Sequence, residues 1–303
     1  MDPTSQIRLS SIMNISSGNP HIKIGLIDGP IELNHSAFQG SIIRAIKVSQ
    51  IAACKSASSL ACKHGTFVTG ILCAKRGSPA PAICPGCTLL LRPVFMDERL
   101  GTNTKGINND IIFPSTTPEE LSDSIIEVVD AGAHIVNLSL ALSTSSLMKY
   151  PILQEAYDYA RRHEVILVAA SGNQGNIGGI SLVNNQWIIP VAACDESGLL
   201  DPISNFGQSI GIRGLMAPGI NITSTSPGGR YIQMSGTSFA VPFVTGALAL
   251  LWSIFPKARA AELIRAIRHA GSSYSHHRSI VPPLLDVELA YQVLKTMYKD
   301  GNT

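Results

Sequence analysis

Short, nearly continuous apolar runs alternate with helical segments along most of this chain. The predicted strands cover residues 22–27, 88–95, 134–140, 165–170 and 187–194. The predicted helices begin at His64 and Pro118 and cover residues 152–163, 239–255, 259–269 and 284–299. Strands that are apolar throughout are typical of a parallel sheet, because helices cover both of its faces. The pattern therefore predicts an α/β fold of three layers, with a mostly parallel sheet between two layers of helices.

Nothing in the sequence divides the chain into parts. We find no repeat, linker or break in composition, and predict a single domain over residues 1–303, with its core at about 20–270 and a C-terminal helix at about 283–299. The net charge is only +2, without a run of Lys and Arg, which argues against a nucleic-acid partner. The longest apolar stretch, residues 239–255, contains Pro242 and Gly246 and is shorter than a membrane span, so we expect a core helix and no membrane partner.

The N-terminal residues carry an expectation about location. Residues 1–14 lack a charged segment followed by a long apolar one, so we predict no secretory signal peptide. This pattern favours the cytoplasm. The oligomeric state cannot be predicted from the sequence.

Six cysteines are too few for a disulfide scaffold in a chain of 303 residues. Cys84 and Cys87 form a CxxC motif without a second ligand pair or a thioredoxin-like context, so we expect either free thiols or one tight structural bridge. Cys54 and Cys62 lie eight residues apart just before His64. A bond between them would fasten the loop that leads to this histidine, but the sequence does not decide whether it forms.

A candidate nucleophile, Ser238, stands between a Gly-Thr pair and the long apolar helix. A serine hydroxyl is a poor nucleophile at neutral pH and needs a base, an acid that orients the base and a donor for the oxyanion. Asp28 ends the strand at 22–27, and His64 begins a predicted helix. Asn173 follows the strand at 165–170, where a turn role is the simpler local interpretation.

These four residues occur in the chain order Asp, His, Asn, Ser, each at the end of a strand or the start of a helix. The order Asp, His, Ser is that of subtilisin and differs from that of chymotrypsin and of the α/β-hydrolases. Each fragment alone is a weak signal. Together they favour a catalytic site at the carboxyl ends of the strands.

The chain resembles the subtilisin-like serine proteases from about residue 22 to residue 252. The matching motifs are LIDG at 26–29, HGTFVTG at 64–70, SNFG at 204–207, MAPG at 216–219 and GTSFAVP at 236–242. Within the family it looks closest to the proteases that mature cyanobactin-type ribosomal peptides, by LIDGPIEL at 26–33, CPGC at 84–87 and AGAHIVN at 131–137. The resemblance implies the three-layer subtilisin-like fold.

The resemblance also implies a role for each candidate residue. Ser238 would attack the scissile carbonyl, His64 would take and return the proton, and Asp28 would hold the imidazole. The side chain of Asn173 and the backbone N–H of Ser238 would stabilise the oxyanion. The residues implied to bind the substrate are Ser139, Leu140, Ala141, Ala170, Ser171 and Gly172.

Two departures from the family pattern concern the cleft. Ala141 and Leu142 replace two glycines, and side chains there restrict the close approach of an extended peptide. The long polar segment 96–117 falls where relatives have a shorter loop beside the non-primed subsites. We therefore predict a narrowed, selective cleft, although these changes could also only repack its rim.

No cofactor or metal is expected. Many relatives hold calcium, but the corresponding stretches here, residues 34–38 and 75–79, lack the carboxylates that Ca²⁺ prefers. Only about 20 polar residues precede the first strand, so no pro-domain is expected either.

We predict a serine endopeptidase that cleaves a precursor peptide by acyl-enzyme hydrolysis, and leader removal in peptide maturation is the expected role. The alternatives are a macrocyclising transamidase of the same family, a general intracellular subtilisin and a non-catalytic peptide-binding protein. Macrocyclases carry a helical insertion between Asp and His, and the 35 residues between Asp28 and His64 leave little room for it. The four intact site residues argue against a non-catalytic protein.

Overall fold

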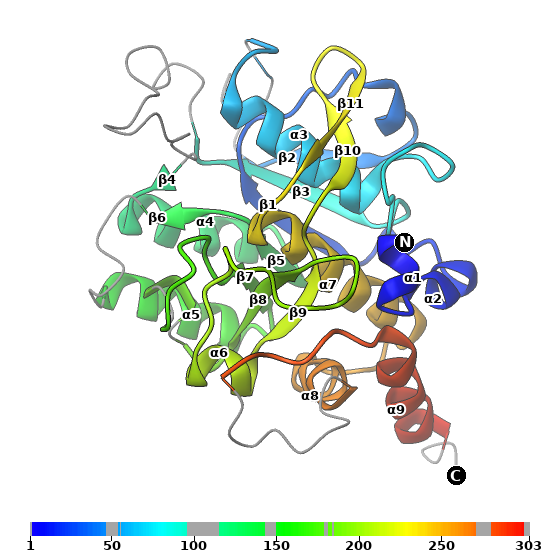
Figure 1. The fold of residues 1–303 in the computed structure, drawn as a ribbon, viewed down its shortest axis with the longest axis vertical. Helices are drawn as coiled ribbons and strands as arrows, with labels where there is room; N and C mark the ends of the chain where they lie inside the picture. The colour runs from blue at the N-terminus through cyan, green and yellow to red at the C-terminus, as the bar shows by residue number, and fades with distance from the viewer. Residues whose placement is uncertain are drawn as a thin grey trace.

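The computed structural model describes residues 2–46, 54, 56–95, 115–142, 150–178, 181–183, 185–270 and 280–299. A seven-stranded sheet runs through the centre of the molecule in the order β2-β3-β1-β5-β7-β8-β9 (Figure 1). All neighbouring strands in it are parallel. The strands are β1 Lys23–Asp28, β2 Ile42–Ala45, β3 Thr88–Pro93, β5 Ile135–Leu138, β7 Ile166–Ala170, β8 Ile188–Cys194 and β9 Leu215–Pro218.

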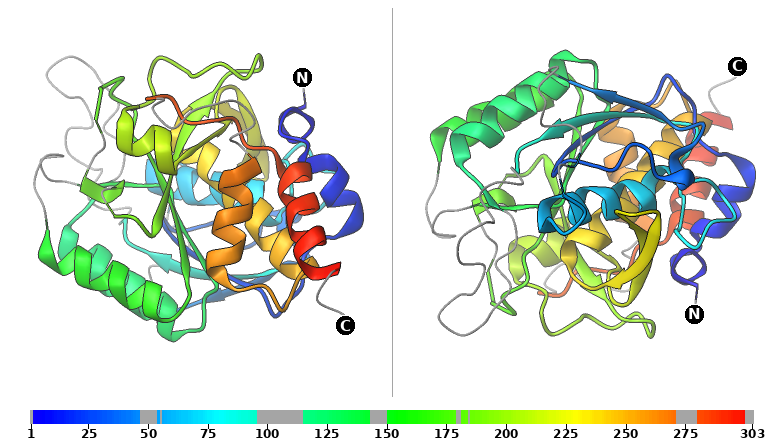
Figure 2. Two further views of the ribbon diagram at one scale, coloured as in Figure 1. Left: turned by 90° about the horizontal axis from the view of Figure 1, so that it is seen from below. Right: turned by 90° about the horizontal axis from the view of Figure 1, so that it is seen from above.

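Helices cover both faces of the sheet, as predicted, and a hydrophobic cluster fills each interface. One layer holds α3 (Leu60–Cys73), α7 (Thr237–Ile254) and α8 (Ala260–Ala270), and the other holds α4 (Pro118–Asp130) and α5 (Pro151–Arg162). Figure 2 shows the green α4 and α5 on the opposite side of the strands from the orange α8. Because side chains alternate along a strand, Ile135 of β5 packs in the first cluster and Val136 in the second.

The helix α7 forms the centre of the first layer. It is long and apolar enough to cross a membrane by length and composition, but 83% of it is buried inside the protein. It packs against β5, β7, β8 and β9. This burial confirms the prediction of a core helix, and Pro242 lies inside it.

The N-terminal residues differ from the polar segment that the sequence suggested. They form two short helices, α1 (Pro3–Gln6) and α2 (Leu9–Ile15), and Ile7, Leu9 and Ile12 are fully buried in the α7 cluster. The C-terminal α9 (Val287–Lys299) packs against α2. The prediction was wrong because three apolar residues among many polar ones are enough to anchor the segment once a partner helix is present.

Two predicted helix starts are also corrected. The helix α3 begins at Leu60 rather than His64, because the Ser59 hydroxyl caps it by accepting a bond from Cys62 N, 3.2 Å away. The last helix begins at Val287 rather than at residue 284. The carboxylate of Asp286, directly before this helix, caps it by accepting from Leu289 N at 3.0 Å. Capping by a side chain therefore set both boundaries.

Two pairs of short strands and one short helix complete the part of the fold that concerns the site. The strands β10 (Ile222–Ser226) and β11 (Arg230–Met234) form an antiparallel hairpin. The two-residue strands β4 (Ser115–Thr116) and β6 (Ala141–Leu142) pair in parallel. The helix α6 (Gln208–Arg213) packs against β8.

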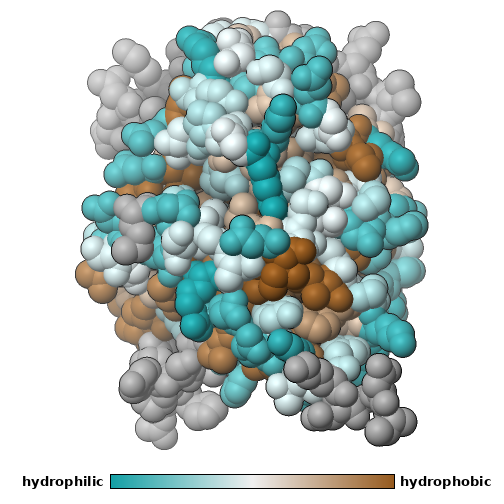
Figure 3. All heavy atoms as spheres, turned by 90° about the vertical axis from the view of Figure 1, so that its right-hand side faces the viewer, coloured by the Kyte–Doolittle hydropathy of each residue, from teal (hydrophilic) through white to brown (hydrophobic). Residues whose placement is uncertain are grey.

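One face of the molecule, the right-hand side of Figure 1, is shown with all heavy atoms in Figure 3. Most of this face is hydrophilic, and its hydrophobic residues form small groups. Elsewhere in the described part of the chain the most exposed large apolar side chain is Ile177, at 76%. Single apolar side chains on a surface are ordinary and by themselves indicate no partner.

Candidate active site

The predicted site residues gather at the carboxyl edge of three adjacent strands. Asp28 ends β1, Ser139 directly follows β5, and residues 171–173 follow β7. The chain leaves β1 toward β2 and β3 on one side and later returns to β5 on the other. Crevices at such switch points of parallel sheets are where ligands bind in α/β proteins.

Asp28 and His64 are in direct contact. Oδ1 of Asp28 lies 2.7 Å from Nδ1 of His64 and accepts a second hydrogen bond from Gly29 N at 2.6 Å. Both side chains are buried, with 0% and 5% exposure. Because a carboxylate can only accept, Nδ1 carries the proton and Nε2 is left with a lone pair, as a general base requires.

Two glycines allow this contact. A Cβ on Gly65 would stand 2.5 Å from the carbonyl oxygen of Gly29, and a Cβ on Gly29 would collide with the backbone of Ala61. The backbone of α3 can therefore approach the end of β1 only where these side chains are missing. This explains why each motif pairs its functional residue with glycine.

Ser238 lies in the first turn of α7, next to a residue that contacts the histidine. The ring of Phe239, the next residue, is 5.4 Å from the ring of His64 between centroids. Gly236 precedes the helix at a φ of 150°, a region that favours glycine, and its N–H donates to Gly219 O at 2.8 Å. The MAPG motif thus supports the turn that presents Ser238.

Asn173 is held with its amide directed at this turn. Its Oδ1 accepts two bonds from Thr237, from the backbone N and from Oγ1, each 2.9 Å long. With Oδ1 occupied, the Nδ2 donor faces Gly236, where a Cβ would lie 3.3 Å from it. The donor rather than the acceptor of the amide is therefore available to an oxyanion near Ser238.

A buried asparagine braces the turn that carries Asn173. Asn205 is 1% exposed; its Oδ1 accepts from the backbone of Gln174 and Asn176 at 3.1 Å each, and its Nδ2 donates to Ser171 O at 3.0 Å. Its backbone N–H donates to Gly172 O. The SNFG motif therefore shapes the loop after β7.

A hydrogen-bonded chain of side chains joins β5 to α7. The Ser139 hydroxyl donates to Ser238 O at 2.7 Å and accepts from Asn137 Nδ2 at 2.8 Å. Asn137 Oδ1 accepts from Thr245 Oγ1 at 2.9 Å. The sequence did not predict a role at the site for the side chains of Asn137 and Thr245, because they lie within a predicted strand and a predicted core helix.

Five of the six predicted substrate-binding residues are described at the edge of the site. Ser139, Leu140, Ala170 and Ser171 are buried, and Gly172 is half-buried. The side chain of Ala141 and residues 96–114 of the predicted cleft segment lie outside the described part. The end of that segment, β4, is hydrogen-bonded to β6. One edge of β6 is therefore already paired in the free protein.

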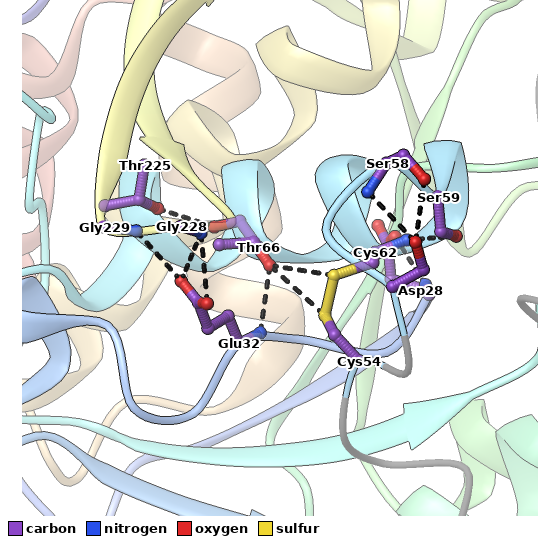
Figure 4. The surroundings of a disulfide bond; sticks show 12 residues. Asp28, Glu32, Cys54, Ser58, Ser59, Cys62, Thr66, Thr225, Gly228 and Gly229 are labelled. Carbon is purple, nitrogen blue, oxygen red and sulfur yellow. Dashed lines mark hydrogen bonds between the residues drawn. A yellow bond between two sulfur atoms is a disulfide. The ribbon is translucent and has the colours of Figure 1, made fainter.

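A disulfide joins Cys54 and Cys62 in front of the histidine, with their Cα atoms 5.5 Å apart (Figure 4). Thr66 Oγ1 lies 4.0 Å from both sulfurs and accepts from Glu32 N at 3.0 Å. The Glu32 carboxylate accepts from the N–H groups of Gly228 and Gly229 in the β10–β11 turn. The disulfide thus lies in a network that joins three segments around α3.

The other cysteines are free and buried: Cys73, Cys84, Cys87 and Cys194. The CxxC motif therefore holds thiols, one of the two outcomes left open by the sequence. A hydrogen bond with Cys87 and burial raise the pKa of the Cys84 thiol, and burial raises that of Cys73 to about 12. The same hydrogen bond lowers the pKa of the Cys87 thiol. Cys73 and Cys84, whose pKa values are raised, are poor nucleophiles as buried, protonated thiols.

Fold, strand-edge site and the order of the side chains are those of a subtilisin-like serine protease. The chain belongs to the subtilase family (Peptidase_S8), whose profile matches residues 19–281. The predicted resemblance to this family is thereby confirmed. The family match does not test the roles of individual residues, which stay predictions.

Two relatives of similar sequence are proteases that are longer than this chain. A thermophilic serine proteinase of Bacillus sp. (strain AK1) is 30% identical over 242 residues, which cover 79% of this chain and 54% of the proteinase. A thermostable alkaline protease of Halalkalibacterium halodurans is 30% identical over 64% of this chain and 48% of its own length. The chain thus spans about half the length of these relatives.

Similar solved structures match nearly the whole chain. The protease domain of PatA, a patellamide maturation protease, has a TM-score of 0.81 at 29% identity over 92% of this chain and 97% of that domain. The prenylagaramide maturation protease PagA has a TM-score of 0.79 at 26% identity over 94% and 98%. The PatG macrocyclase, 20% identical with a TM-score of 0.81 over 97% of both chains, shares the fold.

Proposed function

We propose that this protease is an endopeptidase that removes the leader from a ribosomally made precursor peptide. The observation that carries the chemistry is the buried contact of 2.7 Å between Asp28 and His64 beside the first turn of α7. A histidine oriented in this way has its free nitrogen available to activate Ser238. Likeness to PatA and PagA supports the maturation role.

The reaction would run in two steps. Ser238 Oγ forms a bond to the scissile carbonyl carbon while its proton passes to His64 Nε2, and the C–N bond then breaks as His64 returns the proton to the leaving amine. A water then attacks the resulting ester by the same route and releases the acid. Asp28 stabilises the charged imidazole in both steps.

The oxyanion that forms in each step needs donors that are already in place. Asn173 Nδ2 and the backbone N–H of Ser238 are the candidates, since Thr237 holds the amide by its oxygen. Preorganised donors act mainly on the transition state, because the charge on the oxygen develops only there.

The substrate would bind along the strand that follows β5. A peptide in extended form adds to a free strand edge through backbone hydrogen bonds. Because β4 already pairs with one edge of β6, such a peptide must use the other edge or replace β4. This requirement supports the proposed selective cleft.

Hydrolysis is favoured over macrocyclisation by the connection between Asp28 and α3. Its described residues hold a short 3-10 helix (Ser36–Phe38) and β2, and a disulfide ties its end to α3. An amine can replace water at the acyl-enzyme only if water is kept away. We therefore assign hydrolysis as the outcome.

A fluorophosphonate probe tests the chemistry. Wild-type protein should be labelled at Ser238, and Ser238→Ala should not be labelled. The matched control is Ser235→Ala, which removes an exposed hydroxyl three residues earlier and should leave labelling intact. An unlabelled wild-type protein would identify a peptide-binding protein without catalysis.

Products distinguish the remaining roles. A library of linear peptides with blocked amino termini is incubated with the protein, and the new ends are read by mass spectrometry. The maturation role predicts cleavage at few sequences with linear products. Broad cleavage would instead indicate a general subtilisin, and cyclic products from a library with free amino termini would indicate a macrocyclase.

A further inference from the structure

The helix that carries Ser238 lacks one of its own hydrogen bonds. In an α-helix the carbonyl of residue i accepts from the N–H of residue i+4, and residue i+4 of Ser238 is Pro242. Proline has no N–H, and its ring crowds the carbonyl four residues earlier. The backbone oxygen of the candidate nucleophile is therefore left without its helical donor.

A side chain from the neighbouring strand supplies the missing donor. Ser139, which is 1% exposed, donates its hydroxyl to Ser238 O over 2.7 Å. A carbonyl oxygen that lacks a donor is costly to leave unpaired, so this bond stabilises the first turn of α7. The bond joins the end of β5 to the first turn of α7.

The rest of the chain of side chains sets the direction of this bond. Since a carbonyl oxygen can only accept, the Ser139 hydroxyl must donate to it and must itself accept from Asn137 Nδ2, 2.8 Å away. The Oδ1 of Asn137 then accepts from Thr245 Oγ1, seven residues after Ser238 in α7. Asn137 and Thr245 are both 0% exposed, so water does not compete for these bonds.

We propose that Ser139 is a positioning residue for the nucleophile: its hydroxyl replaces the helix hydrogen bond that Pro242 cannot donate and thereby fixes the first turn of α7, with Asn137 and Thr245 orienting the hydroxyl. Ser139 touches the backbone of Ser238 and takes no proton. The inference rests on the proposed role of Ser238 as nucleophile. It assigns the Ser139 side chain a task separate from substrate binding by its backbone.

A double-mutant cycle between Ser139 and Pro242 tests this replacement. Ser139→Ala should slow fluorophosphonate labelling of Ser238 by about tenfold or more, because a small displacement of a reacting group is costly. Pro242→Ala restores a backbone N–H to Ser238 O. In that background, Ser139→Ala should slow labelling by no more than about threefold, since the two donors are redundant.

The cycle compares ratios and is therefore insensitive to any change that Pro242→Ala causes alone. All rates are measured at a temperature where each variant is fully folded. Ser253→Ala is the matched control, because it removes another α7 hydroxyl, one that donates to Ala249 O within the helix and lies 3.9 Å from Cys87 Sγ. It should leave the labelling rate unchanged.

The free energy of unfolding of the same four proteins gives a second readout. Ser139→Ala should lower the free energy of unfolding more in the wild-type background than in the Pro242→Ala background. This free energy can be measured even if the wild type is never labelled. A protein with coupled stabilities but no labelling would overturn the proposed function and keep the hydrogen-bond replacement.

Three outcomes would overturn the inference, provided that the wild type is labelled. They are a Ser139→Ala variant that is labelled as fast as wild type, an equal loss in both backgrounds, and coupling in stability without any coupling in labelling rate. The last outcome would show that the bond only holds the fold together.

Discussion

Single side chains at this site are placed by what their other atoms bind. Asn173 has its oxygen engaged by Thr237 in two bonds of 2.9 Å, so the direction of its N–H donors is set before any substrate arrives. Asp28 fixes the tautomer of His64 in the same manner. At this scale the structure supplies preorganisation, which makes electrostatic stabilisation of a transition state effective.

Substitution of Asn173 tests its proposed role. Asn173→Ala should lower kcat by about 10²–10³, the cost of removing the corresponding amide from subtilisin, while KM changes little. Steady-state kinetics on a cleaved library peptide give both constants. Asn185→Ala, which removes an amide that accepts from Trp187 N just before β8 begins, is the control. Full activity of Asn173→Ala would remove the oxyanion assignment.

A second residue predicts how stability depends on pH. Burial and the nearby Lys23 lower the pKa of His134, whose Nδ1 accepts from Lys23 N at 3.2 Å. The unfolded chain then binds a proton more readily than the folded one, so this contribution is present above the ordinary histidine pKa of 6.5 and is lost as pH falls below it. His134→Asn, whose Oδ1 can still accept, should lose less stability between pH 7 and pH 5. Equal losses in chemical denaturation would contradict this expectation.

At the scale of elements, the helix α3 is fastened at several points. Its start is capped by Ser59 and bonded through Cys62 to Cys54. Thr66, in its second turn, accepts from Glu32 N, and Thr66 O accepts from Thr225 Oγ1 at 2.7 Å. His64 therefore belongs to a helix whose position depends on connections to the segment after β1 and to the β10–β11 hairpin (Figure 4).

Removal of the disulfide should loosen this arrangement. For a sequence separation of eight residues, loop-closure entropy predicts a loss of about 2–3 kcal/mol in the free energy of unfolding. The variant Cys54→Ser/Cys62→Ser is compared with wild type by chemical denaturation, with and without reductant. Reductant should destabilise the wild type alone, since the remaining cysteines are free thiols. An unchanged midpoint on reduction would show that the bond does not stabilise the fold.

At the scale of the whole molecule, both ends of the described chain pack against the main α/β core. Ile7, Leu9 and Ile12 share a cluster with Val287 and Leu294. The backbone of Val287 donates to Ile7 O, and Arg8 forms an ion pair with Asp286.

The disulfide bears on the cellular location of the protein, because the cytosol keeps most thiols reduced. The expected cytoplasmic location stays a prediction.

Removal of metal ions tests the expectation that no calcium stabilises the fold. Among the described residues no three or more His, Cys, Asp or Glu side chains are grouped to hold an ion. Addition of EDTA should therefore leave the melting temperature within about 2 °C of that in added Ca²⁺. A fall of about 5 °C or more would contradict the prediction and indicate a bound ion.

The sequence by itself determined the layers of the fold and the candidates for the main site residues. Apolar runs predicted the strands because burial on both faces requires them, and the motifs around Asp28, His64 and Ser238 carry glycines where backbones must approach closely.

Only the tertiary structure decided the connections between these parts. The bond from Ser139 to Ser238 O spans 99 residues, the contacts of Asn205 with the Asn173 turn span about 30, and the Cys54–Cys62 bond depends on the path of the intervening loop. Such pairings are set by how elements pack in space, and neither spacing nor propensity encodes them locally. The motifs therefore predict the reacting groups, and the packing of α3 and α7 against the sheet determines how those groups are held.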